Sequence, residues 1–268
     1  MNIDYHTHHV RCGHAVGTLE EYVKRGIEIG LDQLGLSDHM PLLHVDPATY
    51  YPEMAMPMEE LPRYVEEAFN LKAKYKGQID VRVGLEGDYI EGCEEQIERI
   101  IRAYPWDYVI GSVHFLGTWD ISDFRQTHEW EGRDRMAVYA QYYDAVRKAC
   151  ATGFYDYIGH IDVIKRFGFK PEGDVTPLED AALEAVRANG LAIELNASGL
   201  RMPVAEMFPS RRMLSKALEL GIPLTIGSDA HQPERLGQYL EEARELLKEV
   251  GFTQLATFEG RKRAMIDF

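Results

Sequence analysis

The sequence predicts an α/β fold in which seven short strands alternate with seven helices along 268 residues. Two observations support this prediction. Short apolar segments, rich in Val, Ile, Leu and Tyr, alternate with longer segments of helical periodicity, and most of the apolar segments end on a histidine or a carboxylate. Such an alternation implies parallel strands joined by right-handed crossovers. The repeat count fits a closed or nearly closed barrel but also an open, doubly wound sheet.

The predicted elements follow one another without a linker. The strands are expected at residues 3–8, 31–39, 81–86, 107–114, 155–160, 191–196 and 223–231, with a further short strand at 254–258. The helices are expected at residues 18–30, 58–75, 91–103, 135–152, 177–189, 210–220 and 236–250. Thr18 and Glu21 have the spacing of a capping box, and Gly190 and Gly221 are typical helix stops. We therefore expect residues 1–268 to form a single domain.

Two long loops interrupt this pattern. One, from Pro41 to Pro57, is rich in Pro, Tyr and Met, and the other, from Phe115 to Asp134, is polar and aromatic and contains Trp119, Asp120 and Trp130. Loops of this length inside a domain are usually functional. Both loops are long enough to form a lid over a site.

Composition limits the possible partners. The formal net charge is −15, and the densest basic cluster is Arg261-Lys262-Arg263 near the C-terminus. A protein that binds nucleic acid through its phosphates is normally basic, so we expect no nucleic-acid partner. An acidic protein can still bind a small phosphorylated metabolite when metal ions supply the positive charge.

The sequence also indicates a cytoplasmic protein. It contains no run of 18 apolar residues, and its N-terminal segment is polar, so neither a membrane span nor a signal peptide is expected. The cysteines Cys12, Cys93 and Cys150 are scattered and odd in number, which suits a reducing compartment. Cys12 is interpreted as a small packed residue. The oligomeric state is not indicated by the sequence.

The first predicted strand carries a candidate metal site. His6 and His8 are two residues apart, so their side chains lie on the same face of a strand. His14 follows the sharp turn that Gly13 permits and can fold back over the same place. Two imidazoles on one face suit a divalent cation.

Similar residues stand at or near the carboxyl ends of other predicted strands. The candidate ligands are His6, His8, His14, His39, Glu86, His114, His160, Asp229 and His231. In a barrel all strand carboxyl ends meet at one mouth, whereas the outer strands of an open sheet lie too far apart to share a cluster. The ligands therefore favour the barrel. His9, His44 and His128 lack this placement and are assigned to loops or the rim.

The candidate ligands also indicate the chemistry. Imidazoles and carboxylates without thiolates suit Zn, Fe or Mn. Nine ligands exceed what one ion needs and are generous for two, so three ions bridged by Glu86 or Asp229 fit better. Clustered cations lower the pKa of a bridging water and bind phosphoryl oxygens. Phosphoester hydrolysis by a metal-bridging hydroxide is the reaction that we expect.

The motifs His6-x-His8, Cys-Gly-His14, Ser-Asp-His39, Gly-Leu-Glu86, Gly-Ser-Val-His114, Gly-His160-Ile-Asp and Gly-Ser-Asp229-Ala-His231 resemble those of the PHP (polymerase and histidinol phosphatase) superfamily. The chain is most similar to its stand-alone histidinol-phosphate phosphatases. The resemblance implies a distorted (β/α)7 TIM-like barrel and hydrolysis of L-histidinol phosphate in histidine biosynthesis. It also implies three metal sites, whose ligands are His6, His8, Glu86 and Asp229; Glu86, His114 and His160; and His14, His39 and His231.

Substrate contacts are less specific in the sequence. A phosphate dianion is often bound by a guanidinium. Arg201, after the sixth predicted strand, is our first choice, and Arg166, six residues after His160, is the second. Two other functions stay open: a PHP phosphoesterase acting on phosphotyrosine protein or oligonucleotide, and a non-catalytic barrel stabilised by metals.

Overall fold

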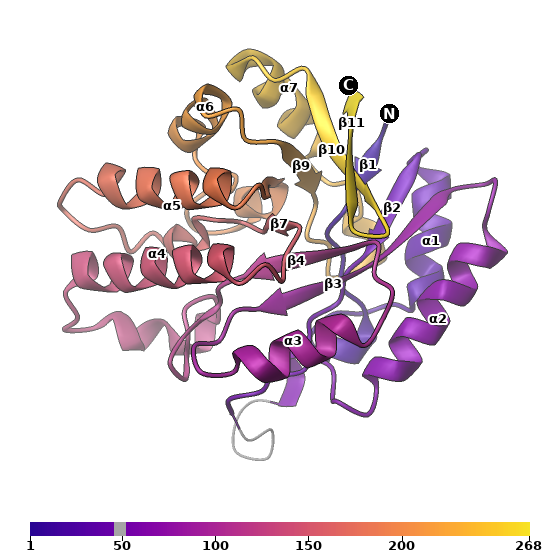
Figure 1. Ribbon diagram of the computed structural model, residues 1–268, viewed down its shortest axis with the longest axis horizontal. Coiled ribbons are helices and arrows are strands. Elements are labelled where there is room, and N and C mark those ends of the chain that lie inside the picture. The colour runs from indigo at the N-terminus through magenta and orange to yellow at the C-terminus, as the bar shows by residue number, and fades with distance from the viewer. Residues whose placement is uncertain (46–51) are drawn as a thin grey trace.

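A computed structural model describes residues 1–45 and 52–268 (Figure 1). Seven parallel strands form one sheet, and their order along the sheet is the order in which they follow in the chain. They are β1 (Ile3–Asp4), β2 (Gln33–Leu36), β3 (Asp80–Asp88), β4 (Tyr108–Ser112), β7 (Tyr157–Ile158), β8 (Ala192–Asn196) and β9 (Leu224–Gly227). This simple order is that of a barrel, in which each crossover places the next strand beside the last.

The first and last strands approach each other and nearly close the barrel. The backbone N–H of Tyr5 donates to the carbonyl of Ile226 at 3.1 Å, and that of His8 donates to Ala230 at 2.9 Å. Thr7 and Ala230 form an isolated parallel bridge. The predicted seven-stranded barrel is confirmed, and the open-sheet alternative is wrong.

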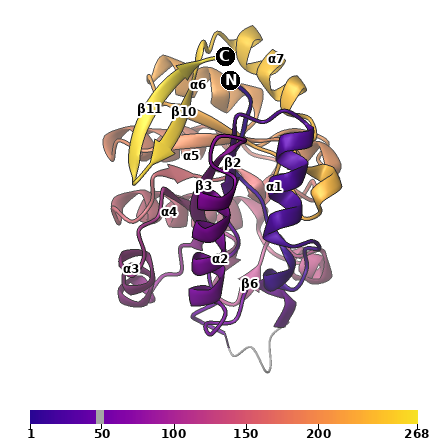
Figure 2. The same ribbon diagram turned by 90° about the vertical axis from the view of Figure 1, so that its right-hand side faces the viewer.

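In the described residues, seven α-helices surround the barrel (Figures 1 and 2). They are α1 (Leu19–Glu28), α2 (Leu61–Lys74), α3 (Glu94–Arg102), α4 (Arg135–Ala151), α5 (Thr176–Ala188), α6 (Arg211–Glu219) and α7 (Leu240–Val250). The predicted capping box is present: Thr18 Oγ1 accepts from the N–H of Glu21, and Glu21 Oε2 accepts from the N–H of Thr18. None of the helices in the described part of the chain has the length and apolar composition that a membrane span needs.

The connecting segments differ from the prediction. The loop 115–134 contains a small hairpin, β5 (Phe115–Leu116) and β6 (Trp119–Asp120), and the 3-10 segment η3 (Phe124–Trp130). Strand β7 is shorter than predicted. Helix α7 begins four residues later than expected, because residues 236–239 form turns after the 3-10 segment η6 (Pro233–Arg235) and Tyr239 has a φ of 65°. Within the loop 41–57, residues 46–51 lie outside the described residues, and Pro52–Met54 form the 3-10 segment η2.

A C-terminal hairpin covers the amino ends of the strands. The predicted strand β10 (Gln254–Glu259) pairs antiparallel with β11 (Lys262–Asp267), which we did not predict. Phe258 lies with its ring centroid 5.4 Å from that of Tyr157 and 6.0 Å from that of Tyr5, and Tyr108 packs against both tyrosines. These aromatic rings fill this end of the barrel, so the mouth at the carboxyl ends is left for a site.

Close packing around Tyr108 explains two glycines in the strands. A Cβ at Gly35 would lie 2.0 Å from the Tyr108 hydroxyl, and one at Gly84 would lie 2.4 Å from the Tyr108 ring. Neither position has room for a side chain. The Gly84-Leu85-Glu86 sequence therefore combines a packing requirement with a candidate ligand on one strand.

Candidate metal centre

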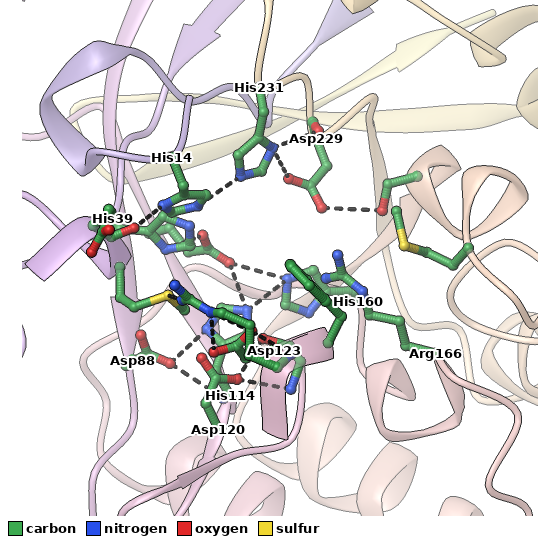
Figure 3. A pocket seen from close by; sticks show the side chains of 18 of the residues that line it. His14, His39, Asp88, His114, Asp120, Asp123, His160, Arg166, Asp229 and His231 are labelled. Carbon is green, nitrogen blue, oxygen red and sulfur yellow. Dashed lines mark hydrogen bonds and ion pairs between the residues drawn. The ribbon is translucent and has the colours of Figure 1, made fainter. Parts of the chain in front are cut away.

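The structure brings all nine predicted ligands together at the mouth at the carboxyl ends of the strands. Figure 3 labels His14, His39, His114, His160, Asp229 and His231. Glu86, at the end of β3, is fully buried at the middle of the cluster. Its Oε2 lies 3.3 Å from His6 Nε2, 3.4 Å from His8 Nε2 and 2.9 Å from His39 Nδ1. Side chains from three segments far apart in the sequence therefore meet at one carboxylate oxygen.

The second oxygen of Glu86 faces the other side of the cluster. Its Oε1 lies 3.1 Å from His160 Nε2 and 3.6 Å from His114 Nε2, and the two imidazole nitrogens are 3.3 Å apart. Ser112 donates its hydroxyl hydrogen to the same oxygen at 2.7 Å. Glu86 thus contacts histidines on both sides, as a carboxylate shared between two ions would.

Asp229 and His231 complete the cluster at the end of β9. Asp229 Oδ1 lies 3.3 Å from His8 Nε2 and 3.4 Å from His231 Nδ1. His231 Nε2 lies 3.1 Å from His14 Nε2. Asp229 has φ of 52° and His160 has φ of 21°, a region that costs energy for residues other than glycine.

Four overlapping groups of donor atoms could each hold an ion. In each group the donor atoms lie within 4.8 Å of one another. They are His6, His8 and Asp229; His6, Glu86 and His160; His39, Glu86 and His114; and His8, His39 and His231. Because the groups share members, they do not by themselves divide the ligands among separate ions.

Several ligand atoms of the cluster lack a hydrogen-bond partner, as atoms that bind cations would. In the described residues, His6 Nε2, His8 Nε2 and Glu86 Oε2 are buried and have no hydrogen-bond partner. Buried polar atoms are almost always satisfied, and converging unsatisfied nitrogen and oxygen atoms are what a divalent cation requires.

A second row of carboxylates orients the histidines, and the sequence analysis did not identify it. His6 Nδ1 lies 2.8 Å from Glu194 Oε1, and His114 Nδ1 lies 2.8 Å from Asp88 Oδ1. Asp38 Oδ1 lies 3.4 Å from His8 Nδ1. An ionised carboxylate only accepts, so the proton of each ring belongs on Nδ1 and the lone pair of Nε2 faces the cluster.

A sequence signal for this second row was available. Asp38 directly precedes His39, and Asp88 comes two residues after Glu86 on the same strand face. Glu194 lies two residues before Asn196 in β8 and also points inward. Burying an acidic side chain inside a barrel costs free energy unless it has a partner. An acidic residue at an inward-facing strand position therefore indicates a partner such as a histidine.

Burial and charge shift the pKa values of the ligands in opposite directions. Burial lowers the pKa of His6 and His8, but neighbouring carboxylates outweigh burial and raise it, to about 9 for His8. Burial and the nearby rings of His39 and His8 lower the pKa of His14 to about 4. Burial likewise lowers the pKa of His231. The cluster therefore combines histidines that attract protons in the metal-free protein with histidines that stay neutral.

The three other histidines have separate environments. His9 lies in a loop, as assigned, but it is buried rather than at the rim and forms an ion pair with Asp38. His44 packs its ring edge-on against Phe115. His128 is exposed, as expected. Cys12 is a buried, packed residue, as we interpreted it.

The cluster forms one wall of a cavity of about 360 Å³. The hairpin β5–β6 and η3 supply other parts of its lining, and both Arg166 and Arg201 also line it. Arg201 donates from Nη2 to the carbonyls of Ser228 and Asp229 at 2.8 and 3.0 Å. In the described residues no hydrogen bond or ion pair engages the guanidinium of Arg166.

The PHP domain model matches residues 4–198. The chain belongs to the PHP family. This match includes the strands from β1 to β8, and seven of the nine candidate ligands lie inside it.

Relatives and solved structures extend the similarity over the whole chain. A probable histidinol-phosphatase of Deinococcus radiodurans is 40% identical over 97% of both chains. The histidinol-phosphatase of Bacillus subtilis is 33% identical over 89% of this chain and 96% of its own. The crystal structure of the histidinol phosphate phosphatase of Lactococcus lactis, complexed with zinc, L-histidinol and phosphate, superimposes with a TM-score of 0.83 at 26% identity, covering 98% of each chain. The similarity to these proteins therefore extends over nearly the whole PHP barrel of this protein.

Proposed function

We propose that this protein is a metal-dependent histidinol-phosphatase, which hydrolyses L-histidinol phosphate to L-histidinol and phosphate in histidine biosynthesis. The observation that carries the proposal is the meeting of nine imidazole and carboxylate side chains in one cluster, seven of which line the same cavity as two arginines. The names of the relatives and the histidinol and phosphate in the Lactococcus lactis structure support the choice of substrate.

We infer that the cluster holds three divalent ions, which can be Zn, Fe or Mn. The number of donors supports three ions, and the mixture of imidazole and carboxylate supports these metals. When bound, such ions activate water at neutral pH and neutralise the charge of a phosphoryl group. His6, His8, Glu86 and Asp229 would hold the first ion; Glu86, His114 and His160 the second; and His14, His39 and His231 the third.

Glu86 and Asp229 are the carboxylates at the reacting centre in this proposal. Each contacts histidines of more than one group. Hydrogen bonds fix their orientation, from Ser112 to Glu86 Oε1 and from the Ser198 hydroxyl to Asp229 Oδ2 at 3.1 Å. Carboxylates held in this way keep the site geometry constant during a reaction, which lowers its barrier.

The arginines bind the phosphate group of the substrate in this proposal. The sequence favoured Arg201, but its Nη2 already donates to two backbone carbonyls and its Nη1 lies 3.3 Å from Gln238 Oε1. Arg166 lines the same cavity with an unsatisfied Nε. Arg166 therefore has more donors to offer a phosphate, and Arg201 is the better placed of the two to support the backbone at Asp229.

Phosphate release tests the function directly. The purified protein would be assayed with L-histidinol phosphate, a phosphotyrosine peptide and a dinucleotide, each with and without a chelator. We expect the highest kcat/KM for L-histidinol phosphate and loss of activity with the chelator. The proposal fails if histidinol phosphate is the poorest of the three substrates, or if chelation leaves the activity unchanged.

A further inference from the structure

The hairpin β5–β6 and η3 place a row of acidic residues on the cavity wall beside His114. Asp120 and Asp123 line the cavity there, together with Asp88 from the end of β3 (Figure 3). All three are buried. A phosphate dianion would be repelled by these carboxylates, so this part of the cavity suits another part of the substrate.

The partners of these acids differ. Asp88 Oδ1 is engaged by His114 Nδ1, and both oxygens of Asp123 lie 3.0 Å from Arg125 Nε. Asp120 Oδ1 accepts from the N–H and the hydroxyl of Ser122, at 2.8 and 2.7 Å. Its other oxygen, Oδ2, is buried and has no hydrogen-bond partner in the described residues.

A buried carboxylate oxygen without a partner is costly unless a ligand supplies one. Asp120 is only 1% exposed, and Ser122 holds its side chain in one orientation, so it cannot turn to solvent without breaking two hydrogen bonds. The partner that matches a carboxylate oxygen best is a cationic N–H donor.

We propose that Asp120 binds the protonated amino group of the substrate and thereby selects phosphate monoesters that carry an ammonium group close to the ester. This inference rests on the proposed function and deepens it. In L-histidinol phosphate the amino group is on the carbon next to the one that carries the ester oxygen. The phosphate and ammonium groups are therefore near each other, and their binding residues must be near each other too.

The position of Arg166 meets this requirement. It lines the same cavity as Asp120, Asp123 and Asp229, and the charges of these three carboxylates act on its guanidinium. A phosphate held at Arg166 would thus lie in the same cavity as Asp120, together with the ammonium group on the adjacent carbon. Asp120 is a specificity residue in this proposal and does not contact the reacting bond.

The test compares two substrates that differ only in the amino group, L-histidinol phosphate and 3-(imidazol-4-yl)propyl phosphate, with the metal-loaded protein. Asp120→Asn retains an oxygen that accepts from Ser122 but removes the charge. We expect kcat/KM for L-histidinol phosphate to fall about 10- to 100-fold, the range for a lost hydrogen bond to a charged group. We expect kcat/KM for the deamino substrate to change little, so the preference for the amine disappears.

Asp123→Asn is the matched control, because it removes the same charge from the same loop but from a carboxylate already engaged by Arg125. It should leave the preference for the amine unchanged. The ratio of the two kcat/KM values does not depend on the fraction of folded or metal-loaded protein. If Asp120→Asn is insoluble, Asp120→Ser is a second neutral variant for the same ratio.

The outcomes separate this inference from the proposed function. If the unaltered protein hydrolyses neither substrate, the proposed function fails, and calorimetric binding of the two esters to the unaltered protein and the variants then decides the role of Asp120. If L-histidinol phosphate is hydrolysed but Asp120→Asn lowers kcat/KM for both substrates by the same factor, Asp120 only supports the loop and the inference is overturned. Retention of the full amine preference in the variant overturns it as well.

Discussion

The Nδ1 atom of His6 lies 2.8 Å from Oε1 of Glu194, and both side chains are completely buried. The other oxygen of Glu194 accepts from the backbone N–H of His160 at 3.0 Å. One carboxylate on β8 therefore orients the first histidine of the chain and the segment that carries a second histidine, 154 residues later. A carboxylate in this position fixes the ring tautomer and raises the basicity of the ligating nitrogen.

We predict that Glu194→Gln weakens metal binding and turnover together. The amide keeps the shape but loses the charge, so activity or metal affinity should fall about 10- to 100-fold, as is typical of outer-shell partners. Metal content by mass spectrometry and kcat would be measured on the same sample. Glu184→Gln, an exposed residue of α5, is the control and should match the unaltered protein. Normal metal content and kcat in Glu194→Gln would contradict the role.

Glu86→Gln should have a larger effect. Glu86 contacts five of the candidate ligands, and its loss removes the charge that holds the two sides of the cluster together. We expect metal and turnover to be lost in parallel. The exposed Glu95→Gln on α3 is the matched control. Full metal content together with full activity in Glu86→Gln would show that Glu86 is not a ligand.

Arg166→Ala and Arg201→Ala should weaken substrate binding more than metal binding. Loss of a charged hydrogen bond to phosphate is expected to lower kcat/KM about 10- to 100-fold, chiefly through KM, with the larger effect for Arg166. Metal content should stay normal in both. Steady-state kinetics and metal analysis check this, with Arg147→Ala on the exposed face of α4 as control. Unchanged kinetics in either variant would reduce that arginine to a structural role.

The metal-free protein should lose stability as the pH rises. Burial lowers the pKa of His8, but the neighbouring carboxylates of Asp229, Asp38 and Glu86 outweigh burial and raise the folded-state pKa from 6.5 to about 9. A group whose pKa is raised by folding stabilises the fold fully below its unfolded pKa, and this stabilisation disappears as the pH rises through the folded pKa. The thermal midpoint of the chelated protein should therefore decrease between about pH 6.5 and 9.

The metal-loaded protein is the comparison for this prediction. Metal binding requires unprotonated imidazoles, so the loaded protein should be more stable than the chelated one, and the difference should grow over the same pH range. Thermal unfolding of both forms at several pH values measures this difference. A constant difference across the range would mean that protons and metals do not compete for these histidines.

The sequence by itself determined the repeated strand and helix pattern and the nine candidate ligands. Both follow from local physics. Periodicity predicts each element without knowledge of its neighbours, and the parallel connection of the strands requires their carboxyl ends to meet at one mouth. His6 and Asp229 could therefore be assigned to one site although 223 positions separate them.

Only the tertiary structure decided which other side chains contact the ligands and the cavity at that mouth. Glu194, Asp38 and Asp88 became visible as partners of the histidines because their roles depend on which rings face them. The preference for Arg166 over Arg201 depends on which guanidinium the backbone at Ser228 and Asp229 already engages. The free oxygen of Asp120 likewise depends on its hydrogen bonds to Ser122. These relations arise from packing between distant segments and from burial, and no local pattern encodes them.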